Sequence, residues 1–379
     1  MKRLFAIIVL FAAFSAQAQK TNFWHKVNNL LITFPNIDTT YIYQPKQGFT
    51  LGMFSTTQQV RLKVKANFNI YSDDGSLTPG ATTYTPIERP NTKLGLELGY
   101  GKFVLGYGVE LGPKKAYKKQ ALGLNLLGKA WGLHFNYFKV SHNFRTDIEI
   151  GTPSDENYWE EQSISSEPAM LKYLSLDGYY VFNNQKFAYP AAYKAGLVQR
   201  KTAGSWMVTG RFMQGHLLNF PNSTEIYQYY NLLDRFSTLQ LSVGGGYSVN
   251  FVCWHKDPSQ LRDKGLRNLT VNLTLLPVIT AINYLKVTTY EITDHVDDLG
   301  KHKSRTFCYP MPNIIGGSAV SLTLDRFFIS TQFVYDWSYF HNAQAINPIF
   351  FANKPNLEDV TLRGAFHYWK IRLLFTYKF

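Results

Sequence analysis

The last eleven residues of the chain alternate between apolar and polar side chains, with Leu374 as the one exception. Every second position is apolar or aromatic, and these positions are Trp369, Ile371, Leu373, Phe375, Tyr377 and Phe379. Successive side chains of a β-strand point to opposite faces, so this segment is predicted to be a strand with one apolar and one mostly cationic face. An apolar face that continues to a terminal aromatic residue is rare in a soluble domain.

The aromatic residues at the end of this strand resemble a known targeting signal. Phe375, Tyr377 and Phe379 stand as in the C-terminal signal by which outer-membrane β-barrels are recognised for insertion. The resemblance implies two partners, namely outer-membrane lipid and the barrel-assembly machinery. It makes the bacterial outer membrane the expected location.

The beginning of the chain predicts export. A short basic region precedes an apolar core, Leu4 to Phe14, and Ala16-Gln17-Ala18 fits a small-x-small cleavage pattern, so residues 1–18 are predicted to be a secretory signal peptide. The apolar core is too short to cross a membrane as a helix, and no later run of about eighteen apolar residues follows. Residues 19–45 show no strand alternation and are expected to form a periplasmic lead-in or N-terminal extension, with a plug-like role also open. Residues 46–379 are expected to form the barrel.

Composition favours a membrane barrel over a soluble enzyme. Aromatic residues make up 16% and charged residues only 17% of the chain, yet the mean hydropathy is −0.19. Transmembrane barrels have this profile because lipid-facing residues alternate with polar lumen residues and aromatic residues gather at the two membrane boundaries. A soluble, aromatic-rich sandwich or jelly roll is the alternative.

The same alternation recurs along the chain. Clear examples are the segments 60–70, 94–100, 103–111, 131–137, 239–251, 269–275, 320–324, 327–337 and 369–379. Segments 171–181, 187–198 and 205–212 are weaker, and 49–54 and 122–127 are further candidates. The prediction is an all-β, transmembrane, antiparallel up-and-down β-barrel of about 12 strands, within a range of about 10 to 14. Segments 72–90, 143–169, 216–237, 284–313 and 339–358 are expected to be long loops on the outer side of the membrane.

Several motifs are similar to those of a known family. They are Asn184 to Ala192, Gln199 to Ser205, Arg89-Pro90-Asn91 and Asp38 to Ile42. They resemble an uncharacterised family of outer-membrane barrels from Gram-negative bacteria, known only as a domain of unknown function, over nearly the whole mature chain. Ala188 and Pro190 differ from the Ser and the basic residue expected there. The resemblance implies location and architecture, and it assigns no residue a role.

Enzymatic motifs are not evident in the sequence. A nucleophilic Ser needs a neighbouring base, yet no G-x-S-x-G elbow occurs, and Gly316 to Ala319 is only a partial match. His134 is expected to be a wetted residue of the lumen wall. We therefore predict no enzyme, with a lipid hydrolase as the least favoured alternative, which would require a Ser and a His to meet on the lipid face.

Metal and cofactor sites are not predicted either. Asp294, Asp297 and Asp298 could surround a calcium ion. Basic residues follow at once, so mutual charge compensation in a solvated loop is the preferred interpretation. The chain has two cysteines, Cys253 and Cys308. The sequence allows either a disulfide between them or two free thiols.

The charge distribution suggests a sharper hypothesis. The chain carries a formal net charge of +13, of which the signal peptide accounts for only Lys2 and Arg3. Closure of a barrel pairs its first strand with its last. If polar positions face the lumen, this pairing predicts a basic lumen seam of Arg61, Lys63, Lys65, Lys370, Arg372 and Lys378. Such a seam would favour anions. The alternatives are acidic loops that fold inward, and basic girdle residues that contact lipid phosphates.

Three functional classes follow from these observations. The first is a passive channel or transporter for small solutes, with anions as the candidates. The second is a non-conducting structural or assembly barrel that acts through its loops, and the third is the lipid hydrolase. At twelve to fourteen strands an open pore is geometrically allowed, whereas a plugged transporter needs about twenty-two. No nucleic-acid partner is expected.

Overall fold

The computed structural model describes residues 36–46, 48–71, 76–86, 90–111, 120–142, 144–156, 158–164, 169–218, 233–258, 264–291, 300–341 and 357–379. This part of the chain is almost entirely β-structure, with one short 3-10 helix, η1 (Tyr189–Ala192). None of its helices has the length and apolar character needed to cross a bilayer. The expected signal peptide, residues 1–18, and most of the expected lead-in lie outside the described residues.

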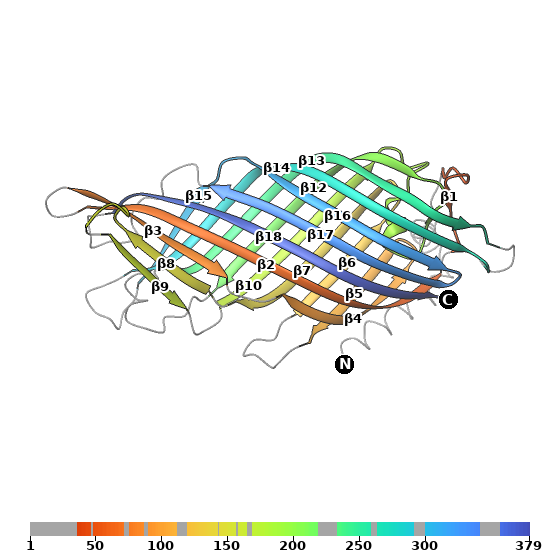
Figure 1. The fold of residues 1–379 in the computed structure, drawn as a ribbon, viewed down its shortest axis with the longest axis horizontal. Coiled ribbons are helices and arrows are strands. Elements are labelled where there is room, and N and C mark those ends of the chain that lie inside the picture. The colour runs from red at the N-terminus through yellow and green to blue at the C-terminus, as the bar shows by residue number, and fades with distance from the viewer. Residues whose placement is uncertain are drawn as a thin grey trace, which may run out of the picture.

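In the described part of the chain, twelve antiparallel strands close into a barrel (Figure 1). They are β2 (Phe49–Tyr71), β4 (Asn91–Tyr100), β5 (Phe103–Glu110), β6 (Gln120–Leu127), β7 (Trp131–His142), β10 (Ala169–Val181), β12 (Ala203–Leu218), β13 (Leu233–Lys256), β14 (Arg267–Glu291), β16 (Met311–Leu324), β17 (Phe327–His341) and β18 (Leu357–Lys378). Each strand pairs with its neighbours in this order, and β18 pairs with β2 to complete the ring. The predicted fold class and the count of twelve are confirmed.

The structure differs from the predicted strand segments in two places. Segments 49–54 and 60–70 are one continuous strand, β2, of 23 residues. Segment 187–198 is not part of the barrel wall, because it turns inward and contains η1. Its apolar residues Phe187, Ala188 and Leu197 are buried inside the barrel. The loss of segment 187–198 from the count is offset by the further candidate 122–127, which is β6 of the wall.

Three of the expected long loops also contain strands. β3 (Leu77–Pro86), β8 (Phe144–Ile150), β9 (Trp159–Ile164) and β15 (Gly300–Phe307) extend the sheet beyond the barrel, at the end opposite the C-terminus (Figure 1). β3 pairs with the far half of β2 and with β8, whereas β15 pairs with β14. These strands carry many polar residues on both faces, so hydrophobic alternation could not reveal them.

The outward face of β18 is apolar, as the sequence predicts. Ile371, Leu373 and Phe375 are 41%, 54% and 44% exposed. Leu374 and Thr376, which point to the opposite face, are each 2% exposed. On β2, Met53, the partner of Phe375, and Leu51, the partner of Tyr377, are exposed too. An outward apolar band of this kind is the lipid-facing surface of a transmembrane barrel.

Aromatic residues border this band at both ends. Near the short turns and the C-terminus, which we call the short-turn end, the exposed residues are Trp131, Tyr180, Trp206 and Tyr247. Towards the opposite, long-loop end, outward positions hold Tyr137, Tyr284, Tyr335, Trp337 and Trp369. A tilted transmembrane strand needs about 9–11 residues, which is the distance along β18 from Trp369 to Phe379.

Candidate functional site

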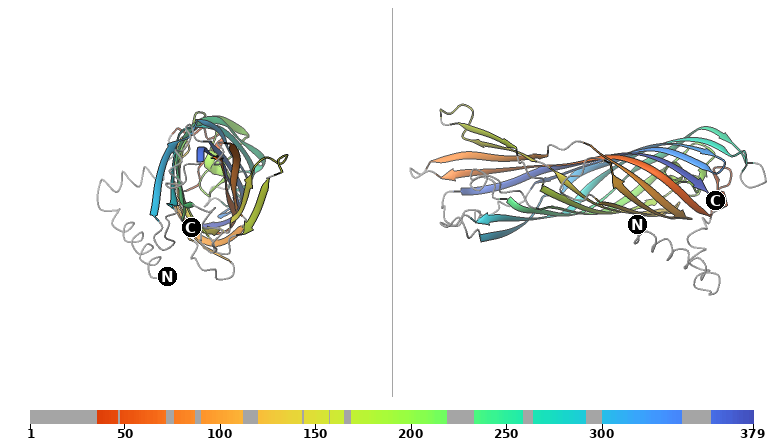
Figure 2. Two further views of the ribbon diagram at one scale, coloured as in Figure 1. Left: turned by 90° about the vertical axis from the view of Figure 1, so that its left-hand side faces the viewer. Right: turned by 90° about the horizontal axis from the view of Figure 1, so that it is seen from below.

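The connection between β10 and β12 folds back into the barrel and closes its short-turn end. Residues 182–202, which we call the plug, include η1 and lie inside the ring of strands in the end-on view (Figure 2). Side chains of the wall hold the plug backbone. Asn250 donates to the Ala188 carbonyl at 2.9 Å, Ser330 to Ala192 at 2.9 Å and Gln332 to Tyr193 at 2.9 Å.

Gln199 joins the plug to the N-terminal segment. Its buried side-chain amide donates to the carbonyls of Lys186 at 2.7 Å and Lys201 at 3.0 Å, and it accepts a bond from the Ala188 N–H at 2.9 Å. The short strands β1 (Ile42–Tyr43) and β11 (Val198–Gln199) pair with each other. Residues 36–46, from the expected lead-in, therefore pack on the plug, and three of the motifs that suggested a family form one unit there.

A second closure crosses the lumen towards the long-loop end. Its members, which we call the roof, come from strands around the ring: Leu62, Val64, Tyr84, Phe138, Leu171, Tyr173, Met213, Phe236, Leu285, Cys308, Phe340, Leu362 and Phe366. The Phe138 and Tyr173 rings stack with centroids 4.5 Å apart, and Tyr173 stacks on Phe366 at 5.2 Å. The lumen at this level is filled by side chains rather than open.

Between plug and roof lies a chamber of about 240 Å³, lined by both polar and apolar side chains. Tyr189 and Tyr193 of the plug form its floor, and Phe138, Tyr173 and Tyr368 form its ceiling. The titratable residues of its wall are Lys93, Glu97, His134, Asp177, Arg211, Asp336, Lys370 and Arg372. We regard this chamber as the candidate site in the lumen, because titratable groups from six strands converge there.

Ion pairs organise the charged wall. Arg211 of β12 bridges two carboxylates, Asp177 of β10 and Asp336 of β17, and Arg372 of β18 pairs with Glu97 of β4. Asp336 is 1% exposed, so its charge depends on Arg211 for compensation. The Arg211–Asp336 pair crosses the lumen between strands that are not neighbours in the ring.

The chamber carries one more cation than it has carboxylates. The four cations are Lys93, Arg211, Lys370 and Arg372, and the three carboxylates are Glu97, Asp177 and Asp336. The Nδ1 of the neutral His134 lies 2.9 Å from the Asn125 Oδ1. The Arg372 Nε and Asp336 Oδ1 atoms are buried without a hydrogen-bond partner in the described protein. A small polar or anionic guest could satisfy Arg372, and the excess charge favours an anion.

The structure divides the expected basic seam into two separate groups. Lys370, Arg372 and Lys378 lie on the inward side of β18, and the first two line the chamber. Arg61 and Lys63 are instead exposed on the outside of β2 and lie opposite His367 and Ala365. Lys65, opposite Arg363, lies 3.5 Å from Glu149. The single lumen seam of six cations is therefore not formed.

Arg61 and Lys63 face outward because the apolar side chains of β2 change from the outer to the inner face along the strand. In the half of β2 near the short-turn end, Leu51 and Met53 point outward to the lipid-facing band. In the other half, the apolar residues Leu62 and Val64 point inward and join the roof. The apolar residues thus move from odd-numbered to even-numbered positions, although the strand itself continues without interruption. The prediction that apolar residues face lipid and polar residues face the lumen is therefore wrong in this half of β2.

The residues of the proposed insertion signal lie at the short-turn end. The Phe375 ring packs against Phe327 with centroids 5.7 Å apart, and Tyr377 meets Phe379 at 5.1 Å. The Phe379 N–H donates to the Phe49 carbonyl at 3.0 Å, which fastens the chain end to β2. Their role in insertion remains a prediction.

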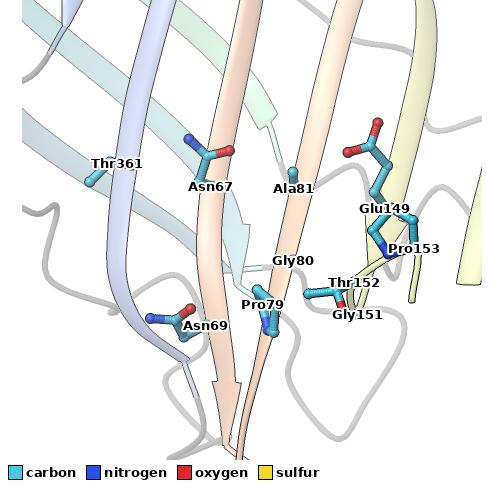
Figure 3. A pocket seen from close by; sticks show the side chains of 10 residues that line it. All are labelled: Asn67, Asn69, Pro79, Gly80, Ala81, Glu149, Gly151, Thr152, Pro153 and Thr361. Atoms are coloured by element: carbon cyan, nitrogen blue, oxygen red, sulfur yellow. The ribbon is translucent and has the colours of Figure 1, made fainter. Parts of the chain in front are cut away.

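A second hollow, of about 380 Å³, lies on the outer face of the strand extension (Figure 3). Asn67, Ala81 and Glu149 line it, with the turn at Gly151 and Thr152 along one side. Its single carboxylate already contacts Lys65. It lacks the convergence of charges that distinguishes the chamber.

Other sequence candidates do not form a site. In the described part of the chain, no group of three or more His, Cys, Asp or Glu residues could hold a metal ion. Asp294, Asp297 and Asp298 lie outside the described residues. Both cysteines are free, with Cys253 exposed and Cys308 in the roof.

Comparison with known proteins identifies a family. The family model for Domain of unknown function (DUF4421) matches residues 36–353. No curated protein matches the chain.

Solved structures match the chain at low identity and low TM-score. The outer membrane protease OmpT from Escherichia coli is 8% identical, with 88% of this chain and 97% of that chain covered, at a TM-score of 0.38. The beta domain of the Bordetella autotransporter BrkA is 10% identical, with 88% and 99% covered, at 0.25. A Pseudomonas aeruginosa FadL homologue is 9% identical, with 87% and 90% covered, at 0.23. These TM-scores carry no argument about activity.

Proposed function

The chain belongs to the DUF4421 family, whose description names no activity, and we propose that it is an outer-membrane barrel that conducts no solutes in its resting state. It serves instead as a rigid membrane platform, presenting its outer face and the strand extension at the long-loop end. The location is supported by the outward apolar band between two aromatic borders. The short-turn end then faces the periplasm, because periplasmic turns are short.

One observation carries the proposal: the lumen is closed twice, by the plug and by the roof. The plug is held by wall side chains from β13, β14 and β17. The roof is a separate apolar layer on the other side of the chamber. Loosening either closure alone leaves the other in place, so thermal motion of one element does not open a path.

Conductance in planar bilayers tests this proposal. The folded wild-type protein is expected to be silent in potassium chloride. A variant with residues 184–201 replaced by a two-residue Asn-Gly turn should also be silent, as should the roof variant Phe138→Ala/Tyr173→Ala/Phe366→Ala. Only the combination of both changes should conduct. Stable openings of the wild-type protein would contradict the proposal.

A second candidate function is gated passage of small anions. The specific observation in its favour is the extra cation of the chamber, which an open lumen would expose to solutes. The combined variant should then prefer chloride in reversal-potential measurements. Replacing Lys93 and Lys370 with Gln should remove that preference, whereas Lys256→Gln/Lys264→Gln, at exposed positions of the short-turn end, should not.

A further inference from the structure

A serine and a histidine meet on the outside of the barrel. The Ser237 Oγ of β13 lies 2.8 Å from the His216 Nδ1 of β12, within hydrogen-bonding distance. A nucleophilic serine needs a neighbouring base at about 2.6–3.2 Å, and the distance between these two side chains meets that requirement.

The pair points towards lipid rather than into the lumen. The residues on either side of Ser237, Phe236 and Thr238, are buried inside the barrel, and Phe236 belongs to the roof. Met213 on β12 is likewise a roof residue, and His216 has the opposite parity. Alternation therefore places the His216 and Ser237 side chains on the outer face.

Two lysines flank the pair in register. Lys172 of β10 is the cross-strand partner of His216, and Lys286 of β14 is the cross-strand partner of Ser237. The order across four adjacent strands is thus Lys172, His216, Ser237, Lys286. Directly opposed side chains have Cβ atoms about 4.5–5.5 Å apart, so both ammonium groups can reach a molecule bound at the pair.

The cationic row continues on both sides. Lys139 lies opposite Lys172, and Arg305 lies opposite Lys286. Like charges directly opposite one another destabilise a sheet, and no carboxylate occupies a described outward position next to the pair. An external anion would offset this repulsion.

The row lies where the lipid-facing band ends. On β7 and β14 the lysines stand two residues beyond Tyr137 and Tyr284, towards the long-loop end. The aromatic border of a barrel marks the headgroup level of a bilayer, where phosphate groups and ester bonds are found. Arg61, Lys63 and Arg363 lie exposed towards the same end on β2 and β18.

We propose that His216 and Ser237 form a hydrolytic site for lipid esters, and that Lys172 and Lys286 hold the lipid phosphate beside it. The roof keeps the site rigid, since Leu171, Phe236 and Leu285, each adjacent to a member of the row, pack within it. The proposal is independent of whether the lumen conducts.

The reaction uses only the lipid and water. The Ser237 Oγ bonds to the ester carbonyl carbon while its proton passes to the His216 Nδ1. Collapse of the tetrahedral intermediate breaks the bond between that carbon and the glycerol oxygen, which takes the proton and leaves as the lysolipid. Water then attacks the acyl-serine and returns a proton through the same ring to Oγ, releasing the fatty acid. The two ammonium groups hold the lipid phosphate during both steps and so position the ester at the Ser237 Oγ.

Covalent labelling tests the nucleophile. The full-length protein, folded in micelles that contain phosphatidylglycerol, is treated with a fluorophosphonate and digested for mass spectrometry. The adduct is expected on Ser237, and both Ser237→Ala and His216→Gln should abolish it. His367→Gln, another outward histidine, which lies 3.4 Å from the Tyr335 hydroxyl, should leave labelling intact. No adduct on Ser237, or an adduct insensitive to His216→Gln, would overturn the proposal.

Substrate preference tests the role of the lysines. Fatty-acid release from phosphatidylglycerol is compared with hydrolysis of a neutral nitrophenyl ester. Lys172→Gln/Lys286→Gln should lower the rate with phosphatidylglycerol relative to that with the neutral ester by at least about tenfold, since each cation near an anionic membrane surface contributes several-fold. Lys256→Gln/Lys264→Gln should leave the ratio unchanged. Equal losses with both esters, or labelling without phosphatidylglycerol hydrolysis, would overturn the assignment to phosphate-bearing lipids.

Discussion

The hydroxyl of Tyr193 donates a 2.7 Å hydrogen bond to the Asn272 Oδ1, which ties the plug to β14. Asn272 in turn donates to Asn250 at 2.8 Å, and Asn250 holds the Ala188 carbonyl. The wall strands thus present a polar network shaped to the plug, and the plug is part of the folded barrel rather than a loose periplasmic loop.

Replacing Gln199 with Ala should release the plug. The change leaves the buried Ala188 N–H and the carbonyls of Lys186 and Lys201 without this partner, at a cost of about 1–3 kcal/mol for each orphaned group. Limited proteolysis of the folded protein should then cut between residues 182 and 202. Asn184→Ala, which removes bonds nearer the surface, should resist cleavage as the wild type does. Equal resistance of the two variants would contradict this role of Gln199.

Plug docking should strengthen as the pH rises from about 7 to about 10. Burial lowers the pKa of Lys194 to about 7, an effect that Glu97 opposes and Lys102 reinforces. In a released plug the ammonium would titrate near its ordinary value of about 10.4, so between these two values only the released state binds the proton. Below about pH 7 both states are protonated, and docking is weakest.

A spin label at Asn184→Cys reports this dependence in a Cys253→Ser background. Its mobility should fall between pH 7 and pH 10 in the protein with Lys194. The additional change Lys194→Met should remove the trend, because the amine whose pKa is lowered by burial in the docked plug is then absent. A trend that persists in Lys194→Met would assign the effect to another group.

Arg211→Met should destabilise the barrel strongly. It leaves the buried Asp336 and the partly buried Asp177 without their cation, and an uncompensated buried charge costs about 3–5 kcal/mol. The triple variant Arg211→Met/Asp177→Asn/Asp336→Asn should recover much of the loss, because neutral side chains need no counter-charge. Urea unfolding of the protein in lipid vesicles measures the difference. A triple variant no more stable than the single one would contradict the electrostatic account.

Two glycines of the wall should respond in opposite ways to Ala. A Cβ on Gly246 would overlap the backbone oxygen of Leu275, whereas a Cβ on Gly210 would meet nothing within 4 Å. Gly246→Ala forces the β13–β14 pairing apart and should cost more than about 2 kcal/mol. Gly210→Ala should be neutral or slightly stabilising, since it restricts the unfolded chain. The same urea measurement compares them.

The sequence predicted the barrel because its lipid-facing band follows one rule. From Trp369 to Phe379, every second residue is apolar and faces outward. Similar segments recur often enough along the chain to indicate a closed sheet of twelve strands. The plug and the roof were not predicted. An apolar residue packed in the lumen, such as Leu62 or Phe187, looks in sequence like one that faces lipid.

The ion pair of the chamber and the proposed hydrolytic pair could not be predicted from the sequence for a related reason. Arg211 reaches Asp336 from a strand 125 residues away, and His216 lies 21 residues from Ser237. Such partners are selected by cross-strand register, which depends on the shear of the whole barrel. No local motif surrounds either pair, so the absence of a G-x-S-x-G elbow carried little information about outer-face chemistry.

Thiol accessibility of the chamber tests the closed lumen most directly. Ser175 lines the chamber and is 2% exposed, so Ser175→Cys, in a Cys253→Ser background, places a thiol inside it. Ser154→Cys, in an exposed turn, serves as the labelled reference. A small charged methanethiosulfonate should modify Ser154→Cys within minutes and leave Ser175→Cys unmodified until residues 184–201 are replaced by Asn-Gly. Rapid modification of Ser175→Cys with the plug intact would contradict a sealed barrel.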